Sequence, residues 1–253
     1  METAHPMRNR YTLAVLATCA LLGLGLYEAL VVAPTEQTMG DVQRIFYYHV
    51  PSAWTAFLLF FANFIASIIY LAVRRKNERA GFRADAFAVA TAEVGVVFTS
   101  IVLVTGPLWA KPVWGIWWTW DARLTTTLVL WLLYVSYLLL RRFSEGQQTA
   151  TLAAVLGIFA YIDVPIVYMS IRWWRTQHPQ PVILGGEESG LDPHMWPPLL
   201  VNWTAFLSLA ALVVGIRYML ARAEQQAEQA EALLALDGHP AASRSYREDE
   251  VRA

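Results

Sequence analysis

The chain has almost no cysteine and carries little charge. Its 253 residues include one cysteine, Cys19, and no CxxC or CxxCH motif. A disulfide within the chain is therefore excluded, and so are a dithiol oxidoreductase and a c-type cytochrome. Charged residues make up 15% of the chain and the net charge is −1, so the composition gives no sign of a nucleic-acid partner.

Apolar residues are abundant instead, at 57% of the chain with a mean hydropathy of +0.39. A soluble domain of this size cannot bury that much apolar surface. Crossing a bilayer takes about 20 apolar residues in a helix. The sequence therefore predicts an all-α polytopic membrane protein with six transmembrane helices, at residues 11–32, 52–73, 86–108, 124–140, 150–171 and 199–220. The fourth of these is short.

Basic residues are distributed unevenly among the connections. Close to the predicted spans, eleven Lys and Arg lie on the side of the termini, against five on the other side. Because cytoplasmic loops are rich in Lys and Arg, we expect both termini in the cytoplasm. Connections 33–51, 109–123 and 172–198 would then face outward, which is the periplasm for a bacterial inner membrane.

The chain divides into two parts. We expect residues 1–220 to form the six-helix transmembrane domain and residues 221–253 to form a cytoplasmic tail. Within the tail, AEQQAEQAEALLAL predicts a polar extension of the last helix, which Gly238 and Pro240 would end. The charged remainder is typical of disorder.

Tryptophan is concentrated in one outward connection and the start of the helix after it. Five of the eleven tryptophans fall in residues 109–127, WAKPVWGIWWTWDARLTTT. If this segment is helical, Trp114, Trp117, Trp118 and Asp121 share one face and form a flat aromatic shelf ending in a carboxylate. An aromatic belt at the membrane interface is the alternative. Five tryptophans interleaved with charges favour a shelf that holds a large planar apolar ligand, and haem is the obvious candidate.

The chain has five histidines: His5, His49, His178, His194 and His239. The first and last lie in the tails, where a solvated surface residue is expected. His49 precedes the second predicted helix, where Pro51 would set the turn into that helix, and His178 follows the fifth. Two imidazoles held in this way can ligate one haem iron from opposite sides. His194 is a weaker candidate ligand than these two. For each of the three, the alternative is an interfacial histidine that binds no metal.

Basic residues in the outward connections can pair with the two propionates of a haem. The candidates are Arg44, Lys111, Arg123, Arg172 and Arg175. Arginine suits a carboxylate better than lysine does, because its fork binds in bidentate fashion. The sequence alone does not distinguish among them, and anchoring of helix ends in the headgroup region is the alternative.

Two carboxylates, Glu93 and Asp163, fall within predicted spans, where they are costly and suggest function. A proton-coupled transporter subunit using this pair is one rival interpretation, and hydrogen bonds between packed helices are the structural one. Pro165 should kink the fifth helix beside Asp163. A b-type membrane cytochrome oxidoreductase is a second rival, but such proteins usually bury their ligands within spans, and no predicted span contains a histidine.

These motifs together resemble one family. WGIWWTWDARLTT closely resembles the tryptophan-rich WWD signature of haem-handling proteins. The segments YYHVPSA, ahead of the second span, and WWRTQHPQP, after the fifth, are similar to those of the CcmC family of the cytochrome c maturation system. The six-span layout and the length agree over about residues 10–220.

The resemblance implies a protein that is not an enzyme. It implies that haem b is bound transiently as cargo at the periplasmic face of the inner membrane and is presented to the haem chaperone CcmE. The ATP-binding cassette pair CcmA and CcmB, the small membrane protein CcmD and membrane lipid are the other implied partners. The implied axial ligands are His49 and His178. The implied haem support comprises Trp114, Trp117, Trp118, Trp120 and Asp121.

Overall fold

The computed structural model describes residues 5–144, 146, 148–174, 176–181 and 190–237, and no β-strand occurs among them. The α-helices are α1 (His5–Tyr27), α2 (Phe46–Val73), α3 (Glu78–Trp114), α4 (Ala122–Phe143), α5 (Thr149–Tyr161), α6 (Asp163–Trp173) and α7 (Trp196–Asp237). A π-helical turn, η1 (Glu28–Val32), follows α1, and 3₁₀ turns η2 (Asp41–Ile45) and η3 (Pro193–Met195) precede α2 and α7. The predicted all-α class is confirmed.

Six helical stretches are long and apolar enough to cross a membrane, counting α5 and α6 as one, so the chain is a multi-pass membrane protein. They coincide with the six predicted spans. The fourth, predicted to be short, has 22 residues in the structure. The second and third are longer than predicted, because their polar ends remain helical.

The fifth span is broken where the sequence predicts a kink. Helix α5 ends at Tyr161 and α6 begins at Asp163. Pro165 lacks a backbone N–H, and its ring collides with the carbonyl four residues earlier, that of Tyr161. The break between the two helices therefore follows from a single proline.

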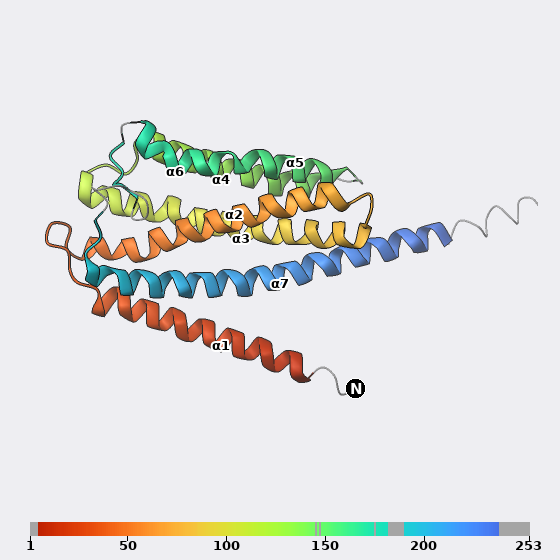
Figure 1. The fold of residues 1–253 in the computed structure, drawn as a ribbon, viewed down its shortest axis with the longest axis horizontal. Coiled ribbons are helices and arrows are strands. Elements are labelled where there is room, and N and C mark those ends of the chain that lie inside the picture. Colours follow the sequence, from red (N-terminus) through yellow and green to blue (C-terminus); the bar gives the residue numbers. More distant parts are fainter. Residues whose placement is uncertain (1–4, 145, 147, 175, 182–189, 238–253) are drawn as a thin grey trace, which may run out of the picture.

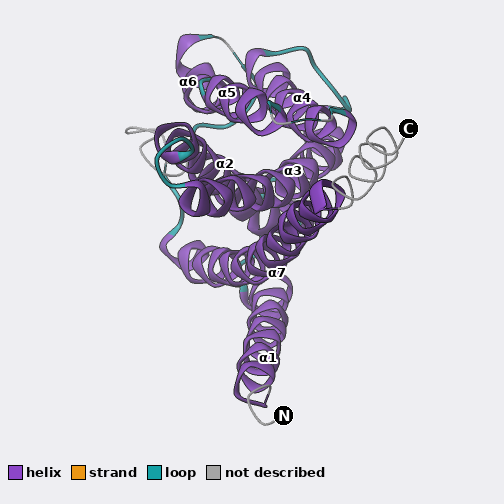
Figure 2. Ribbon diagram, turned by 90° about the vertical axis from the view of Figure 1, so that its right-hand side faces the viewer, coloured by secondary structure: helices purple, strands orange, loops and turns teal. Residues whose placement is uncertain are grey.

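Helices α2 and α3 form the centre of the bundle (Figures 1 and 2). The α4–α6 group lies on one side of them, and α7 followed by α1 lies on the other. In the core the Phe60 ring stacks on that of Tyr134 with centroids 3.7 Å apart. Gly95 makes room for this stack, because a Cβ at that position would lie 2.5 Å from the Phe60 ring. The outermost helix, α1, is joined to α7 by Asn202, whose Nδ2 donates to the Gly25 carbonyl at 2.9 Å.

Two ion pairs join helices away from the tryptophan-rich end. Arg141 of α4 holds the buried Asp85 of α3 in a bidentate pair at 2.7 and 2.9 Å, and Gln225 of α7 also donates to Asp85. Arg217 of α7 pairs with Glu93 at 2.5 and 2.6 Å. Glu93 therefore has the interhelical role that the structural interpretation expects.

Both described ends of the chain lie at one end of the bundle, opposite the tryptophan-rich connection (Figure 1). Helix α7 continues without a break through the predicted polar extension to Asp237. His239 and the rest of the predicted tail, residues 238–253, lie outside the described residues. Which end faces the cytoplasm stays a prediction.

Candidate functional site

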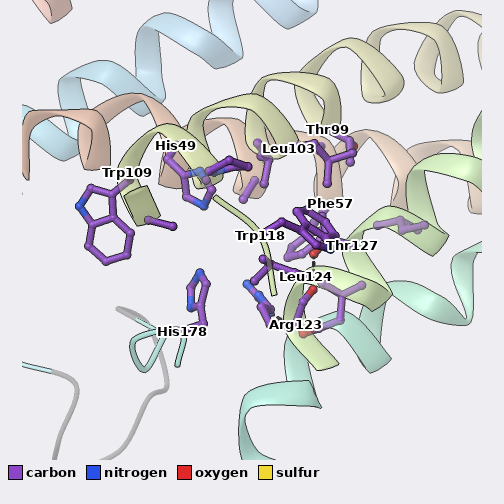
Figure 3. Close-up of a pocket in the computed structure, with 18 of the residues that line it drawn as sticks. His49, Phe57, Thr99, Leu103, Trp109, Trp118, Arg123, Leu124, Thr127 and His178 are labelled. Atoms are coloured by element: carbon purple, nitrogen blue, oxygen red, sulfur yellow. Dashed lines mark hydrogen bonds between the residues drawn. The ribbon is translucent and has the colours of Figure 1, made fainter. Parts of the chain in front are cut away.

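A cavity opens at the end of the bundle where α2, α3, α4 and α6 meet (Figure 3). The residues that line it and carry the argument are His49, Trp109, Trp114, Trp118, Arg123 and His178. They come from three predicted outward connections or the helix ends beside them. The fold therefore brings together residues that are far apart in the sequence, at one end of the bundle (Figures 1 and 3).

His49 lies inside a helix, which corrects the sequence-based placement. Helix α2 begins at Phe46, directly after η2, so His49 is in its first turn and Pro51 is inside the helix. The expectation that Pro51 sets the helix start was wrong. A proline this close to a helix start costs one backbone hydrogen bond, which the preceding 3₁₀ turn and the packing tolerate. The statement that no span contains a histidine is corrected too, although His49 lies at the end of the helix.

Hydrogen bonds fix the tautomer of His49. Its Nδ1 lies 2.8 Å from the Thr105 Oγ1 of α3. The Thr105 hydroxyl donates its own hydrogen to the Ile101 carbonyl at 2.7 Å, so it accepts from the imidazole. Nδ1 of His49 therefore carries the hydrogen, and the lone pair of Nε2 is free.

The same reasoning fixes His178. Its Nδ1 lies 2.8 Å from the Pro179 carbonyl, which can only accept, so Nδ1 is the donor and the Nε2 lone pair is free. Its backbone N–H donates to Thr176 Oγ1 at 3.1 Å, and this hydroxyl donates to Asp121 Oδ2 at 3.0 Å. The loop that carries His178 is therefore tied to the start of α4.

The two imidazoles point toward one another (Figure 3), and their ring centroids are 6.4 Å apart. An imidazole nitrogen lies about 2 Å from a metal that it ligates and about 1.2 Å from the centre of its own ring, so two trans ligands have centroids about 6.4 Å apart. Each ring also has the Nδ1–H hydrogen bond that usually orients a metal-ligating histidine. The separation of the two rings therefore equals the separation expected if one iron were held between them.

The tryptophan-rich segment is not a continuous helix, and the predicted shared face is wrong. Gly115 has φ +78° and ends α3 after Trp114. Residues 115–121 form a non-helical connection, so the 3.6-residue spacing does not apply to them. Trp114 and Trp118 line the cavity together with Trp109, whereas Trp117 is 55% exposed and Trp120 is 75% exposed.

Two of the cavity tryptophans have unused donors. Within the described residues, the indole N–H groups of Trp109 and Trp118 are buried without a hydrogen-bond partner. Buried donors are costly when they stay unpaired. A ligand with oxygen acceptors at its rim would satisfy them, and the carboxylates of a haem are such acceptors.

Asp121 does not end an aromatic shelf; it holds neighbouring segments of the site together through hydrogen bonds. Its Oδ1 accepts from the Leu124 N–H at 3.0 Å and caps α4. Its Oδ2 accepts from Thr119 and from Thr176, which holds the His178 backbone. One carboxylate thus links the tryptophan segment, a helix start and the loop of a candidate ligand.

Among the described basic candidates, Arg123 alone lines the cavity. It donates to the Val167 carbonyl of α6. Lys111 instead donates to the Gly115 carbonyl at 2.9 Å and lies over the Trp117 ring. Arg44 is engaged by Asp41 and backbone carbonyls, and Arg172 lies over the Tyr168 ring. Arg175 lies outside the described residues.

The remaining candidates lie outside the cavity. His194 is exposed and its Nδ1 lies 3.0 Å from an Asp192 carboxylate oxygen. Asp163 is buried at the start of α6, and its Oδ2 has no hydrogen-bond partner within the described residues. Neither residue is among those lining the cavity.

Sequence reasoning missed Thr105 and Thr176. A threonine in an apolar helix usually bonds its own backbone, as Thr105 does to Ile101, so it gives no distinctive signal. The signal would have been a polar side chain on the face that carries Trp109, one turn earlier in α3. Only the packing of α3 against α2 shows that Thr105 reaches His49.

We expect Thr105→Val to weaken haem binding about 10- to 100-fold, the usual cost of losing a second-shell partner of a ligating histidine. The substitution keeps the shape of the side chain but removes the acceptor for Nδ1–H. Haem titration followed by absorbance measures the effect. Thr99→Val is the control, because Thr99 lines the same cavity but bonds the Gly95 carbonyl. Equal affinities in the two variants would contradict the role of Thr105.

Comparisons with known proteins identify the family of the chain. Residues 3–233 match the family described as CcmC, heme exporter protein C. The chain belongs to the CcmC family. Curated proteins named heme exporter protein C are similar to it along most of both chains. That of Bradyrhizobium diazoefficiens is 38% identical, covering 76% of this chain and 71% of the relative. That of Haemophilus influenzae is 34% identical, with 84% of each chain covered, and that of Escherichia coli K12 is 34% identical, with 80% and 79% covered.

Proposed function

We propose that this chain binds haem b as transient cargo at the periplasmic face of a bacterial inner membrane and delivers it to the haem chaperone CcmE for c-type cytochrome maturation. His49 and His178 would be the axial ligands. The observation that carries the proposal is the 6.4 Å separation of two imidazoles that each keep a free Nε2. The names of the family and of the curated relatives support haem export as the process served.

The remaining site residues would surround the porphyrin. Trp114 and Trp118 would contact its apolar plane, and Arg123 would pair with a propionate. Lys111, Trp117 and Trp120 lie outside the cavity lining, on the exposed side of the same segment. We propose that they contact the outer edge of the haem or the approaching chaperone.

The size of the cavity supports a handover rather than permanent storage. Its volume is about 60 Å³, far below the roughly 300–1,000 Å³ of pockets that bury a drug-sized ligand. A porphyrin could enter it only in part, so one edge would stay accessible. Covalent capture of the haem by a partner protein needs such an accessible edge. In this proposal the chain itself supplies no catalytic group.

Partner proteins follow from the same proposal. An ATP-binding cassette pair, CcmA and CcmB, and the small protein CcmD would complete the exporter in the membrane. Both termini of this chain would face the cytoplasm, because the site occupies the opposite end of the bundle (Figure 1).

The decisive experiment co-expresses this chain with the haem chaperone and measures covalent haem on the chaperone by haem staining and mass spectrometry. We expect covalent haem only when this chain is present, and loss of it with His178→Ala. His194→Ala is the matched control, since that histidine is exposed and pairs with Asp192. Equal covalent haem with and without the chain would reject the proposal.

We also expect haem uptake to change little between pH 7.5 and pH 5.5. Burial, and then repulsion by Arg123, lower the pKa of His178 to about 4, against the opposing hydrogen bond to Pro179. His178 therefore stays neutral and able to ligate throughout this range. An imidazole with the ordinary pKa of about 6.5 would be about 90% protonated at pH 5.5 and would bind about tenfold more weakly.

Haem titrations of the purified protein at the two pH values measure this difference, and a tenfold loss at the lower pH would contradict it. The same shift lowers folding stability in acid. Between pH 6.5 and about 4 the unfolded chain binds a proton that the folded His178 does not, so stability falls as the pH falls through this window.

A further inference from the structure

A second hollow lies at the other end of the α2–α3 hairpin, where the two helices meet α7 (right-hand end in Figure 1). Its volume is about 840 Å³. Phe61, Ile65 and Ile69 of α2 and Phe87 of α3 line it and are exposed. It is therefore a groove open to the surroundings of the bundle.

The groove changes from charged to apolar along its length. On α3, Arg79, Arg83 and Phe87 follow at four-residue spacing and all line it. A rise of 1.5 Å per residue places Phe87 about 12 Å from Arg79 along the helix. On α2, Ile69, Ile65 and Phe61 run alongside with the same spacing. Two cations thus lie near the start of α3, and apolar side chains continue from them toward the middle of the helix.

The two arginines have free charges. No hydrogen bond or ion pair joins Arg79 or Arg83 to any described residue, and both side chains are exposed. Two other arginines at this end are engaged: Arg74 donates to Thr151, and Arg141 holds Asp85. Arg75 and Arg142 have no partner among the described residues either, but they lie outside the groove lining. Basic pockets between transmembrane helices bind anionic lipid headgroups. Two free guanidinium groups one turn apart suit a phosphodiester, which accepts bidentate bonds.

We propose that this groove binds an anionic phospholipid, with its phosphate at Arg79 and Arg83 and an acyl chain along Ile69, Ile65 and Phe61. Haem is the other amphiphile that such a surface could attract. The residues that line the groove include no histidine, cysteine or methionine, and the tyrosine among them, Tyr218, belongs to a residue type that ligates haem iron far less often than histidine does. A lipid accounts for both the two arginines and the row of apolar side chains, Ile69, Ile65 and Phe61, and it requires no metal ligand.

Native mass spectrometry of the purified full chain tests the proposal, with phosphatidylglycerol or phosphatidylcholine added to the detergent. We expect retention of phosphatidylglycerol and little phosphatidylcholine, and about thirtyfold weaker retention in the double variant Arg79→Gln, Arg83→Gln. The matched control is Arg75→Gln, Arg142→Gln, which removes the same charge at the same end but outside the groove lining. This control should bind like the unaltered chain.

Three results would overturn the inference. Equal retention of both lipids would remove the role of headgroup charge, and equal loss in the two double variants would show that only net charge matters. Displacement of phosphatidylglycerol by added haem would make haem the occupant. A haem spectrum measured on each variant shows that the other end of the bundle is intact, so a folding defect is not mistaken for loss of a lipid site.

Discussion

Replacing either His49 or His178 by alanine is expected to lower haem affinity by more than about 100-fold, because loss of a second-shell partner alone costs about 10- to 100-fold. Each variant would leave one nitrogen ligand, so the Soret band should weaken and shift. The double variant should lose affinity further, because it also removes the ligand that each single variant keeps, but the two losses need not add, since both ligands act on one iron.

Absorbance spectra of protein purified from membranes with added haem measure this effect. His194→Ala is the control, since its imidazole is exposed and lies on Asp192 rather than in the cavity. An unchanged spectrum in both His49→Ala and His178→Ala would end the ligand assignment. A loss in one variant only would indicate a single-histidine site, and the 6.4 Å separation would then have no role.

Asp85→Ala is expected to cause the largest loss of stability, about 3–5 kcal/mol, the usual cost of removing one partner of a buried ion pair. The carboxylate is 8% exposed and holds Arg141 in two bonds, and Gln225 of α7 also donates to it. The substitution would leave a guanidinium without its counter-charge and remove the hydrogen bonds by which Asp85 links α3 to α4 and α7.

Reversible unfolding in mixed detergent micelles measures the change in free energy. Asp85→Ala combined with Arg141→Met should be more stable than Asp85→Ala alone, because it removes the unpaired charge as well. Arg142→Met is the control, since that neighbouring arginine is exposed. If the double variant were no better than the single one, the ion pair would not be the source of the loss.

The rival interpretations are affected differently by the structure. Pairing of Glu93 with Arg217 gives that carboxylate a structural partner, which weakens the transporter hypothesis for it. Asp163 keeps an oxygen without a partner among the described residues, so it remains the better test of that hypothesis. A transporter predicts that Asp163→Asn abolishes function with an intact haem spectrum.

The sequence by itself determined the class of fold and the neighbourhood of the site. Runs of about 20 apolar residues force helices in a membrane, because backbone groups there have no water to bond. The break at Pro165 and the continuation of α7 to Asp237 were also predictable from the sequence, because each depends on local backbone chemistry. Counting the spans was enough to place His49, the tryptophan-rich segment and His178 at the same end of the bundle.

Only the tertiary structure decided which side chains meet. Helical spacing suggested a single tryptophan face, but Gly115 ends α3 and turns Trp117 and Trp120 outward. Thr105 could not be assigned to His49, because a hydrogen bond between two helices depends on their relative rotation. Local chemistry determines each helix, whereas the separation of the two imidazole rings depends on how α2, α3 and the loop after α6 pack together.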